Sequence, residues 1–300
     1  QMCIRDRTFG FGGDALSLTF ALLALGIGGV VLLYSAAYLH EDDKPRSFYI
    51  FMTGFALSVL ILVLAADVVV LFVGWELVSI ASFLLIAQSG SAGEKGASRT
   101  LILTFFGGLT LLAALGIAVA VTGTTNIEAI VTSPAWKSSG LTTAFALLIA
   151  CSGFTKAAQF PFHLWLPEAM AAATPVSAFL HAAAVVKAGV YLLIRFSPVF
   201  VDNQVWSVLL MVVGMGTAIM SAFFAIQKTD LKKLTAYSTV SHLGWIVATI
   251  GTGAIAAAVV HTIAHALFKS SLFMLVGVVD HQAGSRDVRR LGSLVVDHTD

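Results

Sequence analysis

The sequence contains a succession of apolar runs, each about as long as a helix that crosses a lipid bilayer. The first run, residues 15–39, has no charged residue, and a membrane-spanning helix needs roughly 20 mainly apolar residues. Over the whole chain, 58% of residues are hydrophobic and 11% are charged, whereas ordinary soluble domains are about 25% charged. The pattern therefore predicts an all-α, polytopic transmembrane helix bundle and excludes a soluble domain.

The apolar runs and the polar loops between them predict about nine membrane spans within residues 15–280, and residues 1–300 form a single transmembrane domain. The predicted spans are 15–39, 48–66, 67–88, 99–122, 141–172, 174–195, 205–227, 231–251 and 255–280. The polar stub at residues 1–7, QMCIRDR, does not match this apolar pattern. We therefore interpret the stub as non-native, a remnant of cloning or assembly.

The fifth predicted span is long because prolines break it. Lys156 follows fifteen residues whose only polar side chains are hydroxyls, so it lies deep in the span, and Pro161 comes five residues later. Proline lacks the N–H group and clashes with the preceding turn, and Pro167 is expected to repeat the break. Burying a lysine near the middle of a membrane costs roughly 2.5–3.5 kcal/mol. Broken helices at that depth line protected cavities and mark ion sites in transporters, so Lys156 is the central candidate.

Further polar residues lie in the middle of other predicted spans. Glu76 is the only carboxylate in the middle of an unbroken predicted span. On the ninth span three polar side chains follow at intervals of four residues, which places them on one helix face in a stripe about 12 Å long. Inside a membrane, the polar side chains of such a stripe need hydrogen bonds to water or to other protein groups. The candidate functional residues are Glu76, Lys156, His181, Lys187, His261, His265 and Lys269.

Each candidate also has a structural interpretation. His242 is equally well explained as a residue that bridges two helices, and a structural role is favoured for His163, next to Pro161. His261 and His265 have the spacing of half a zinc site, but a lysine follows on the same face and would repel the metal, so no metal is predicted. A static set of buried ion pairs is the alternative for Glu76, Lys156, Lys187 and Lys269.

Composition excludes several other classes of function. The net charge is +1, so nucleic acid is not predicted as a partner. Only two cysteines are present, Cys3 and Cys151, and neither belongs to a CxxC motif. A disulfide framework is therefore excluded, and nothing indicates an iron–sulfur or haem site. No cofactor is predicted, and any electron carriers would lie on other subunits.

The distribution of lysine and arginine predicts the orientation in the membrane, because cationic loops stay on the cytoplasmic side. Alternate loops and the tail together carry Lys44, Arg46, Lys95, Arg99, Lys228, Lys232, Lys233, Arg286, Arg289 and Arg290. The opposite face has only Lys137 and Arg195. We therefore expect a multi-pass protein of the cell membrane whose first span starts outside the cytoplasm.

Several long runs resemble the antiporter-like subunit family. These runs are GWELVSIASFLLI, TKAAQFPFHLWLPEAM, TPVSAFLHAAAVVKAGVYLLIRF, DLKKLTAYSTVSHLGW and HTIAHALFKSSLFMLVGVVDHQAGSRDVRRLGSL. The family includes the large A subunit of multisubunit Mrp-type Na+/H+ antiporters and the related proton-pumping subunits of respiratory complex I. The resemblance covers about residues 9–295. Lys187 in AVVKAG and the ending DHQAGSRDVRRLG are most similar to the A subunit of the Mrp type.

The resemblance implies roles for the candidate residues. Glu76 matches the family's glutamate, which pairs with the lysine of the broken helix, here Lys156. His181 and Lys187 match the groups that lead inward from this pair. Lys269 matches the family's central lysine, with His261 and His265 beside it.

The resemblance also implies a division into repeats. Residues 48–196 would be the first of two inverted five-helix repeats, and residues 205–280 would be part of the second. The usual first helices and the second broken helix have no counterpart in this chain. We therefore expect the chain to be a fragment of a longer subunit.

The expected function is proton translocation in a multisubunit monovalent cation (Na+)/H+ antiporter, which is a transporter and not an enzyme. Burial and a nearby carboxylate act in opposite directions on how tightly a lysine holds its proton, so movement of Glu76 would gate Lys156. The expected partners are other membrane subunits, Na+, H+ and the lipid bilayer. Two alternatives stay open: a proton-pumping subunit of complex I or a related membrane-bound redox complex, and a structural scaffold subunit with inert ion pairs.

Overall fold

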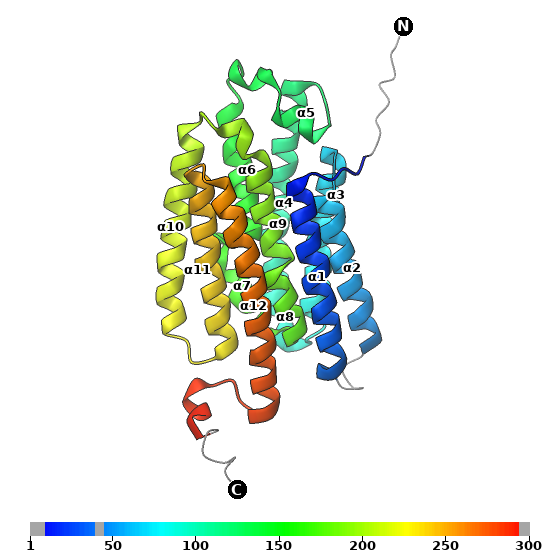
Figure 1. The fold of residues 1–300 in the computed structure, drawn as a ribbon, viewed down its shortest axis with the longest axis vertical. Helices are drawn as coiled ribbons and strands as arrows, with labels where there is room; N and C mark the ends of the chain where they lie inside the picture. The colour runs from blue at the N-terminus through cyan, green and yellow to red at the C-terminus, as the bar shows by residue number, and fades with distance from the viewer. Residues whose placement is uncertain (1–9, 40–44, 294–300) are drawn as a thin grey trace.

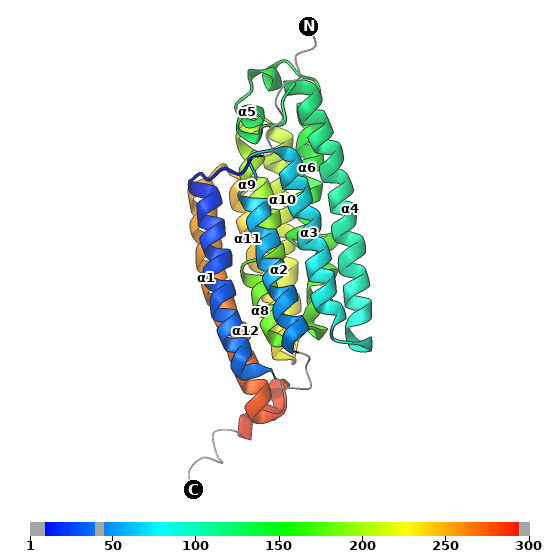
Figure 2. The same cartoon turned by 90° about the vertical axis from the view of Figure 1, so that its right-hand side faces the viewer.

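A computed structural model describes residues 10–39 and 45–293 of the chain. The stub at residues 1–7 and Lys44 of the first cationic loop lie outside the described residues. The helices run along one long axis, and the connections between them gather at the two ends of the bundle (Figure 1). Seen from the side, α1 and α12 lie at one edge and α4 lies at the other (Figure 2).

Each of the nine predicted spans is helical over most of its length. The long helices are α1 Ala15–Tyr38, α2 Pro45–Val63, α3 Val68–Ala87, α4 Ser91–Thr122, α6 Thr142–Lys156, α8 Thr174–Ala182, α9 Val185–Phe196, α10 Gln204–Ile226, α11 Leu231–Gly251 and α12 Ile255–Ala283. Short helices are α5 Ile127–Val131 and α7 Trp165–Glu168. The prediction of an all-α fold is confirmed.

Seven segments of the described chain are long and apolar enough to cross a membrane, with α8 and α9 taken together as Thr174–Phe200. The two other predicted spans correspond to α6, which has 15 residues, and α11, which carries Lys232 and Lys233 in its first turn. The chain is therefore a multi-pass membrane protein. The total of nine membrane spans remains a prediction.

The fifth predicted span is broken directly after Lys156, where α6 ends. The side-chain amide of Gln159 donates to the carbonyl of Ala157 at 2.7 Å, so a side chain satisfies the carbonyl that the break leaves free. Pro167 does not repeat the break, contrary to expectation. It lies within the first turn of α7, where an N–H group has no helical partner to lose.

A second break, which the sequence did not predict, separates α8 from α9 at Ala183 and Ala184. The N–H groups of both residues approach the carbonyl of Phe179, at 3.0 and 3.1 Å. The Ala184 amide therefore reaches five residues back, which widens the turn. Wide turns of this kind inside helices are frequent at functional sites. This one lies between His181 and Lys187.

The α8–α9 segment is the centre of the bundle, and every residue from 174 to 194 is buried. Large apolar side chains on the outer helices are instead exposed, for example Leu33 at 77% and Ile219 at 62%. Exposed apolar surface suits helices that face lipid. The candidate residues on α8 and α9 are therefore shielded from the bilayer by the surrounding helices.

An ion pair joins α1 to α9 at one end of the bundle. Arg195 donates to both carboxylate oxygens of Asp14, at 2.5 and 2.9 Å, and to the hydroxyl of Ser17. The Asp14 carboxylate also accepts from the Ser17 N–H and so caps α1. The hydrogen bond from Arg195 holds the pKa of the Asp14 carboxyl well below its usual range.

Candidate functional site

Lys156 is fully buried at the C-terminal end of α6. Its ammonium group donates to the carbonyl of Trp75 and to the hydroxyl of Ser79, both at 2.8 Å. The Nζ atom also lies 4.5 Å from the centre of the Trp75 ring. Uncharged groups of α3 therefore bind the ammonium group. The lysine itself is the last residue of α6, directly before the break.

Glu76 follows Trp75 on α3, but its carboxylate points towards another helix. The Oε1 atom is buried and has no hydrogen-bond partner among the residues that the structure describes. A Cβ atom placed on Gly108 of α4 would lie 1.8 Å from Oε1, so the carboxylate occupies space that only a glycine leaves open. The ion pairs among the described residues do not include Glu76 with Lys156. In the described structure the hydrogen-bond acceptors of the Lys156 ammonium group are therefore the Trp75 carbonyl and the Ser79 hydroxyl, and not the Glu76 carboxylate.

Lys187 and His265 form the direct link between α9 and α12. The lysine Nζ lies 2.9 Å from Nδ1 of His265, and the two residues are 1% and 0% exposed. The other ring nitrogen of His265 is buried and has no hydrogen-bond partner within the described chain. A lysine can therefore hand its proton to an imidazole that keeps a second nitrogen free.

Lys269 lies one turn beyond His265 on α12 and turns towards α11. Its ammonium group donates to the hydroxyl of Ser238 at 2.7 Å and to the carbonyl of Thr235 at 3.4 Å. It is 1% exposed. Lys187 on α9 and His265 and Lys269 on α12 thus form one buried group, and α11 supplies the acceptors of Lys269.

His261 joins this group through a residue of α11. Its Nε2 atom lies 3.2 Å from Nδ1 of His242, and the rings of His242 and His265 are 5.5 Å apart. His242 therefore bridges α11 and α12. The described residues contain no group of three His, Cys, Asp or Glu side chains that could hold a metal ion.

His181 hydrogen-bonds to neither group. Both of its ring nitrogens are buried without a partner in the described part of the chain, and its ring lies 4.6 Å from that of Phe273 on α12. The structure thus brings Lys187, His261, His265 and Lys269 together and leaves Glu76 with Lys156 as a separate group. Buried polar atoms without protein partners are commonly served by ordered water.

Sequence reasoning missed the groups that hold the lysines. Ser79 and Ser238 were not singled out, although each is a hydroxyl within a predicted span and therefore a possible intramembrane acceptor. Lys232 was assigned to a loop, yet it is 2% exposed and donates to the carbonyl of Ala172. Its position four residues before the buried Ala236 on α11 was the available signal.

Three of the buried lysines, Lys156, Lys187 and Lys269, share a chemical property that suits proton exchange. Their hydrogen-bond acceptors are carbonyl, hydroxyl and imidazole groups, and none forms an ion pair with a carboxylate in the described structure. A buried lysine held by neutral acceptors can lose its proton without leaving an unpaired carboxylate behind. The arrangement can therefore take up and release protons at several points.

Two family descriptions match the sequence. Residues 65–298 match the transmembrane family of NADH:quinone oxidoreductases and Mrp antiporters. Residues 6–49 match the N-terminus of chain 5 of NADH-ubiquinone oxidoreductase, complex I. Together the two matches cover the described chain except for residues 50–64.

Individual proteins are similar over most of this chain. The A subunit of a Na(+)/H(+) antiporter from Alkalihalophilus pseudofirmus is 42% identical over 303 residues, which cover 94% of this chain and 38% of the relative. The A1 subunit of a Na(+)/H(+) antiporter from Staphylococcus aureus is 41% identical over 301 residues, with the same coverage.

A solved structure of the Mrp complex from Dietzia sp. DQ12-45-1b contains a chain of the same fold. It superposes with a TM-score of 0.88 at 54% identity and covers 91% of this chain and 31% of that one. Compared with the two antiporter subunits above, this chain spans about 38% of their length. Because the first family match covers most of the sequence, the chain belongs to the NADH:quinone oxidoreductase/Mrp antiporter transmembrane family.

Proposed function

We propose that the chain is part of a proton-translocating subunit in a multisubunit Na+/H+ antiporter. The names of its relatives support this proposal, since two of them are the A or A1 subunits of such antiporters. The Mrp complex that contains a chain of the same fold supports other membrane subunits as partners. The transported ions would be H+ and a monovalent cation, Na+.

The observation that carries the proposal is the contact between Lys187 and His265 at 2.9 Å. Lysines buried in a membrane protein are costly and usually functional, and an imidazole can pass a proton on near neutral pH. We infer that a proton moves from Lys156, gated by Glu76, through water and His181 to Lys187. From there His265 passes it to Lys269, with His261 beside this route.

The test uses the full-length subunit in its assembled complex, reconstituted into proteoliposomes. Lys187→Arg keeps the positive charge but cannot release a proton, so we expect it to abolish Na+-dependent proton exchange while the complex still assembles. Lys137→Arg, in the exposed 3-10 turn after α5, is the matched control. Exchange at the wild-type rate in Lys187→Arg would remove this residue from the proton route.

A second candidate is a proton-pumping subunit of complex I or a related redox complex. The match of residues 6–49 to the N-terminus of a complex I chain favours it. Purification of the full-length protein from its own membranes separates the two candidates. Quinone-reducing subunits with iron–sulfur clusters would co-purify under the second candidate and would be missing under the first.

For location we propose the cell membrane, with the start of α1 outside the cytoplasm. The turn between α10 and α11 lies at the end of the bundle opposite α5 (Figure 1), and this stretch of the chain carries three lysines. Cationic ends are retained in the cytoplasm. Single cysteines at Gln227 and Lys137, in a background without Cys3 and Cys151, should react with an impermeant reagent from opposite sides. Reaction of both from outside would contradict the assignment.

We also propose that residues 48–196 form the first of two inverted five-helix repeats and that residues 205–280 form part of the second. This proposal is supported by the way in which two lysines are held: α3 supplies a carbonyl and a serine hydroxyl to Lys156, and α11 supplies the same two groups to Lys269. A superposition of α2–α4 on α10–α12, in the same chain order and with opposite orientation in the membrane, within an experimental structure of the full-length protein tests it.

A further inference from the structure

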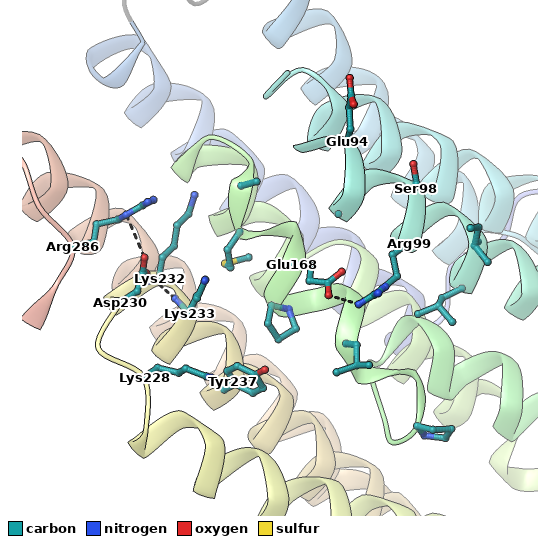
Figure 3. A pocket seen from close by; sticks show the side chains of 18 residues that line it. Glu94, Ser98, Arg99, Glu168, Lys228, Asp230, Lys232, Lys233, Tyr237 and Arg286 are labelled. Carbon is teal, nitrogen blue, oxygen red and sulfur yellow. Dashed lines mark hydrogen bonds and ion pairs between the residues drawn. The ribbon is translucent and has the colours of Figure 1, made fainter. Parts of the chain in front are cut away.

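A large cavity lies where α4 and α11 begin, and it is lined by none of Lys156, Lys187 and Lys269, which we call the buried lysine row. Its volume is about 1260 Å³. Figure 3 shows side chains from α4, α7, α11 and the segment after α12 around it. None of the seven candidate residues lines it. The cavity therefore needs an explanation of its own.

Positive charge dominates the polar part of this cavity. Its lining contains five cationic and three acidic residues, namely Arg99, Lys228, Lys232, Lys233 and Arg286 with Glu94, Glu168 and Asp230. Arg99 pairs with Glu168 and Arg286 lies 3.8 Å from Asp230. The net formal charge of the lining is thus +2, from five positive and three negative groups.

The excess charge resides on three lysines that have no ion-pair partner among the described residues, Lys228, Lys232 and Lys233. Lys232 is 2% exposed, and within the described chain its ammonium group donates to the carbonyl of Ala172 alone. The Lys228 ammonium lies 5.2 Å from the Tyr237 ring centre. Three ammonium groups on one wall favour an anionic occupant.

The first backbone N–H groups of α11 are not available to that occupant. The carboxylate of Asp230 accepts from the N–H groups of Lys232 and Lys233, at 2.8 and 3.1 Å. An anion in the cavity would therefore be bound by the lysine side chains and not by the end of the helix. Recognition would depend on charge at the side chains, which substitution can remove.

The rest of the cavity wall is apolar. Ile102 of α4 and Leu164, which precedes α7, line it and are 67% and 46% exposed. Leu103 and Met170 extend the apolar lining. An inorganic anion would leave this surface uncovered, whereas a molecule with an anionic head and hydrocarbon chains would cover both parts.

We propose that this cavity binds an anionic phospholipid, with its phosphate at Lys228 and Lys233 and its acyl chains along Ile102 and Leu164. The cavity lies at the end of the bundle that carries most of the lysines and arginines, which is the end where anionic lipid headgroups attract cationic side chains. Basic pockets between membrane helices on the cytoplasmic side bind such headgroups. The lipid would join α4, α7 and α11 independently of any proton movement.

The experiment measures phospholipid that remains bound to the purified full-length complex by native mass spectrometry, after exchange into phosphatidylglycerol or phosphatidylcholine. Wild type should retain phosphatidylglycerol and not phosphatidylcholine. In Lys228→Gln/Lys233→Gln, retention should fall roughly thirtyfold, as expected when two cations near a headgroup are lost. Lys137→Gln, at the opposite end of the bundle, should retain lipid like wild type.

A second variant tests the apolar half without changing charge. Ile102→Trp should fill part of the space for the acyl chains and reduce retention of phosphatidylglycerol, while assembly of the complex is unchanged.

Equal retention of the two lipids, or unchanged retention in the double lysine variant, would overturn the proposal. Inorganic phosphate that raises the unfolding temperature as much as phosphatidylglycerol would assign the site to free phosphate and overturn it too. No bound lipid at all would show that another part of the full-length complex fills the cavity, which also overturns the proposal.

Discussion

The two ends of the buried lysine row are held in the same way. Lys156 donates to a carbonyl and a hydroxyl one turn apart on α3, those of Trp75 and Ser79. Lys269 donates to the hydroxyl of Ser238 and to a carbonyl one turn earlier on α11. Both lysines are buried, and both are met by neutral acceptors. The shared arrangement provides a place for the ammonium group and does not by itself decide when the proton leaves.

What differs is the titratable residue beside each lysine. Glu76 lies next to the acceptors of Lys156, and within the described part of the chain its Oε1 atom accepts no hydrogen bond. Near Lys269 the neighbour is His265, one turn away on the same helix and bound to Lys187. A carboxylate changes a lysine's proton affinity through charge, whereas an imidazole can exchange the proton itself. In the proton route that we propose, the first site would therefore control when the proton leaves and the second would transfer it.

The largest expected effect comes from replacing either lysine by arginine. Lys156→Arg and Lys269→Arg in the full-length subunit keep the charge and remove proton release, so each should lower Na+-dependent proton exchange by roughly 100-fold or more. Fluorescence quenching in proteoliposomes measures the rate, with Lys137→Arg as the control. If only one of the two variants loses activity, the lysines do not belong to one proton route.

A smaller effect, confined to the first site, is expected for Gly108→Ala. The new Cβ atom would lie 1.8 Å from Oε1 of Glu76, so the carboxylate must move, at a cost of about 1–3 kcal/mol for overpacking. Gly116→Ala on the same helix meets no atom within 4 Å and is the control. Unfolding temperature and exchange rate should both fall in the first variant only. Identical behaviour of the two variants would contradict the position assigned to the carboxylate.

His265→Leu should affect the second site more than His261→Leu does. The first change removes the acceptor of Lys187 and leaves a buried ammonium group without a partner, which costs roughly 1–3 kcal/mol or more. The second removes a half-buried imidazole whose partner His242 stays close to other rings. Thermal unfolding and proton exchange of the two variants give the comparison. A larger loss in His261→Leu would place the main proton route on the His242 side.

The smallest effect is expected far from both lysine sites, at Asp14. Asp14→Asn weakens a half-exposed ion pair and changes a helix cap, so we expect a loss of about 1 kcal/mol or less. Because the pKa of the Asp14 carboxyl is lowered by Arg195, its contribution is present above about pH 4 and declines as the pH falls further. Unfolding temperatures of variant and wild type should therefore differ at pH 7 and converge in acid. A constant difference would exclude the carboxylate as the cause.

The sequence predicted the helices well because each apolar run and each proline acts locally. Proline at 161 and the lysine five residues before it predicted the break after α6. The break at Ala183 and Ala184 could not be predicted, because neither proline nor glycine lies there and the wide turn depends on packing at the centre of the bundle. The contact between Lys187 and His265 joins residues 78 positions apart, and no local pattern specifies it.

Local sequence patterns also could not show where the carboxylate of Glu76 would lie. Its place in an apolar run identified it as a candidate, and the family resemblance implied that it pairs with Lys156. Whether a carboxylate contacts that lysine depends on side chains of α3 and α4 together, and here the free space over Gly108 receives it. The cavity between α4, α7 and α11 has no signal in the sequence either, since segments far apart in the chain form it.

The fully buried α8–α9 segment has a mechanical consequence. Residues 174–194 are surrounded by other helices, so a change in bilayer thickness acts on the outer helices first. Tilting or stretching of those helices costs only fractions of a kcal/mol per ångström of mismatch and absorbs the deformation before it reaches the centre. Distances such as that between Lys187 and His265 should therefore depend little on whether the surrounding membrane is thick or thin.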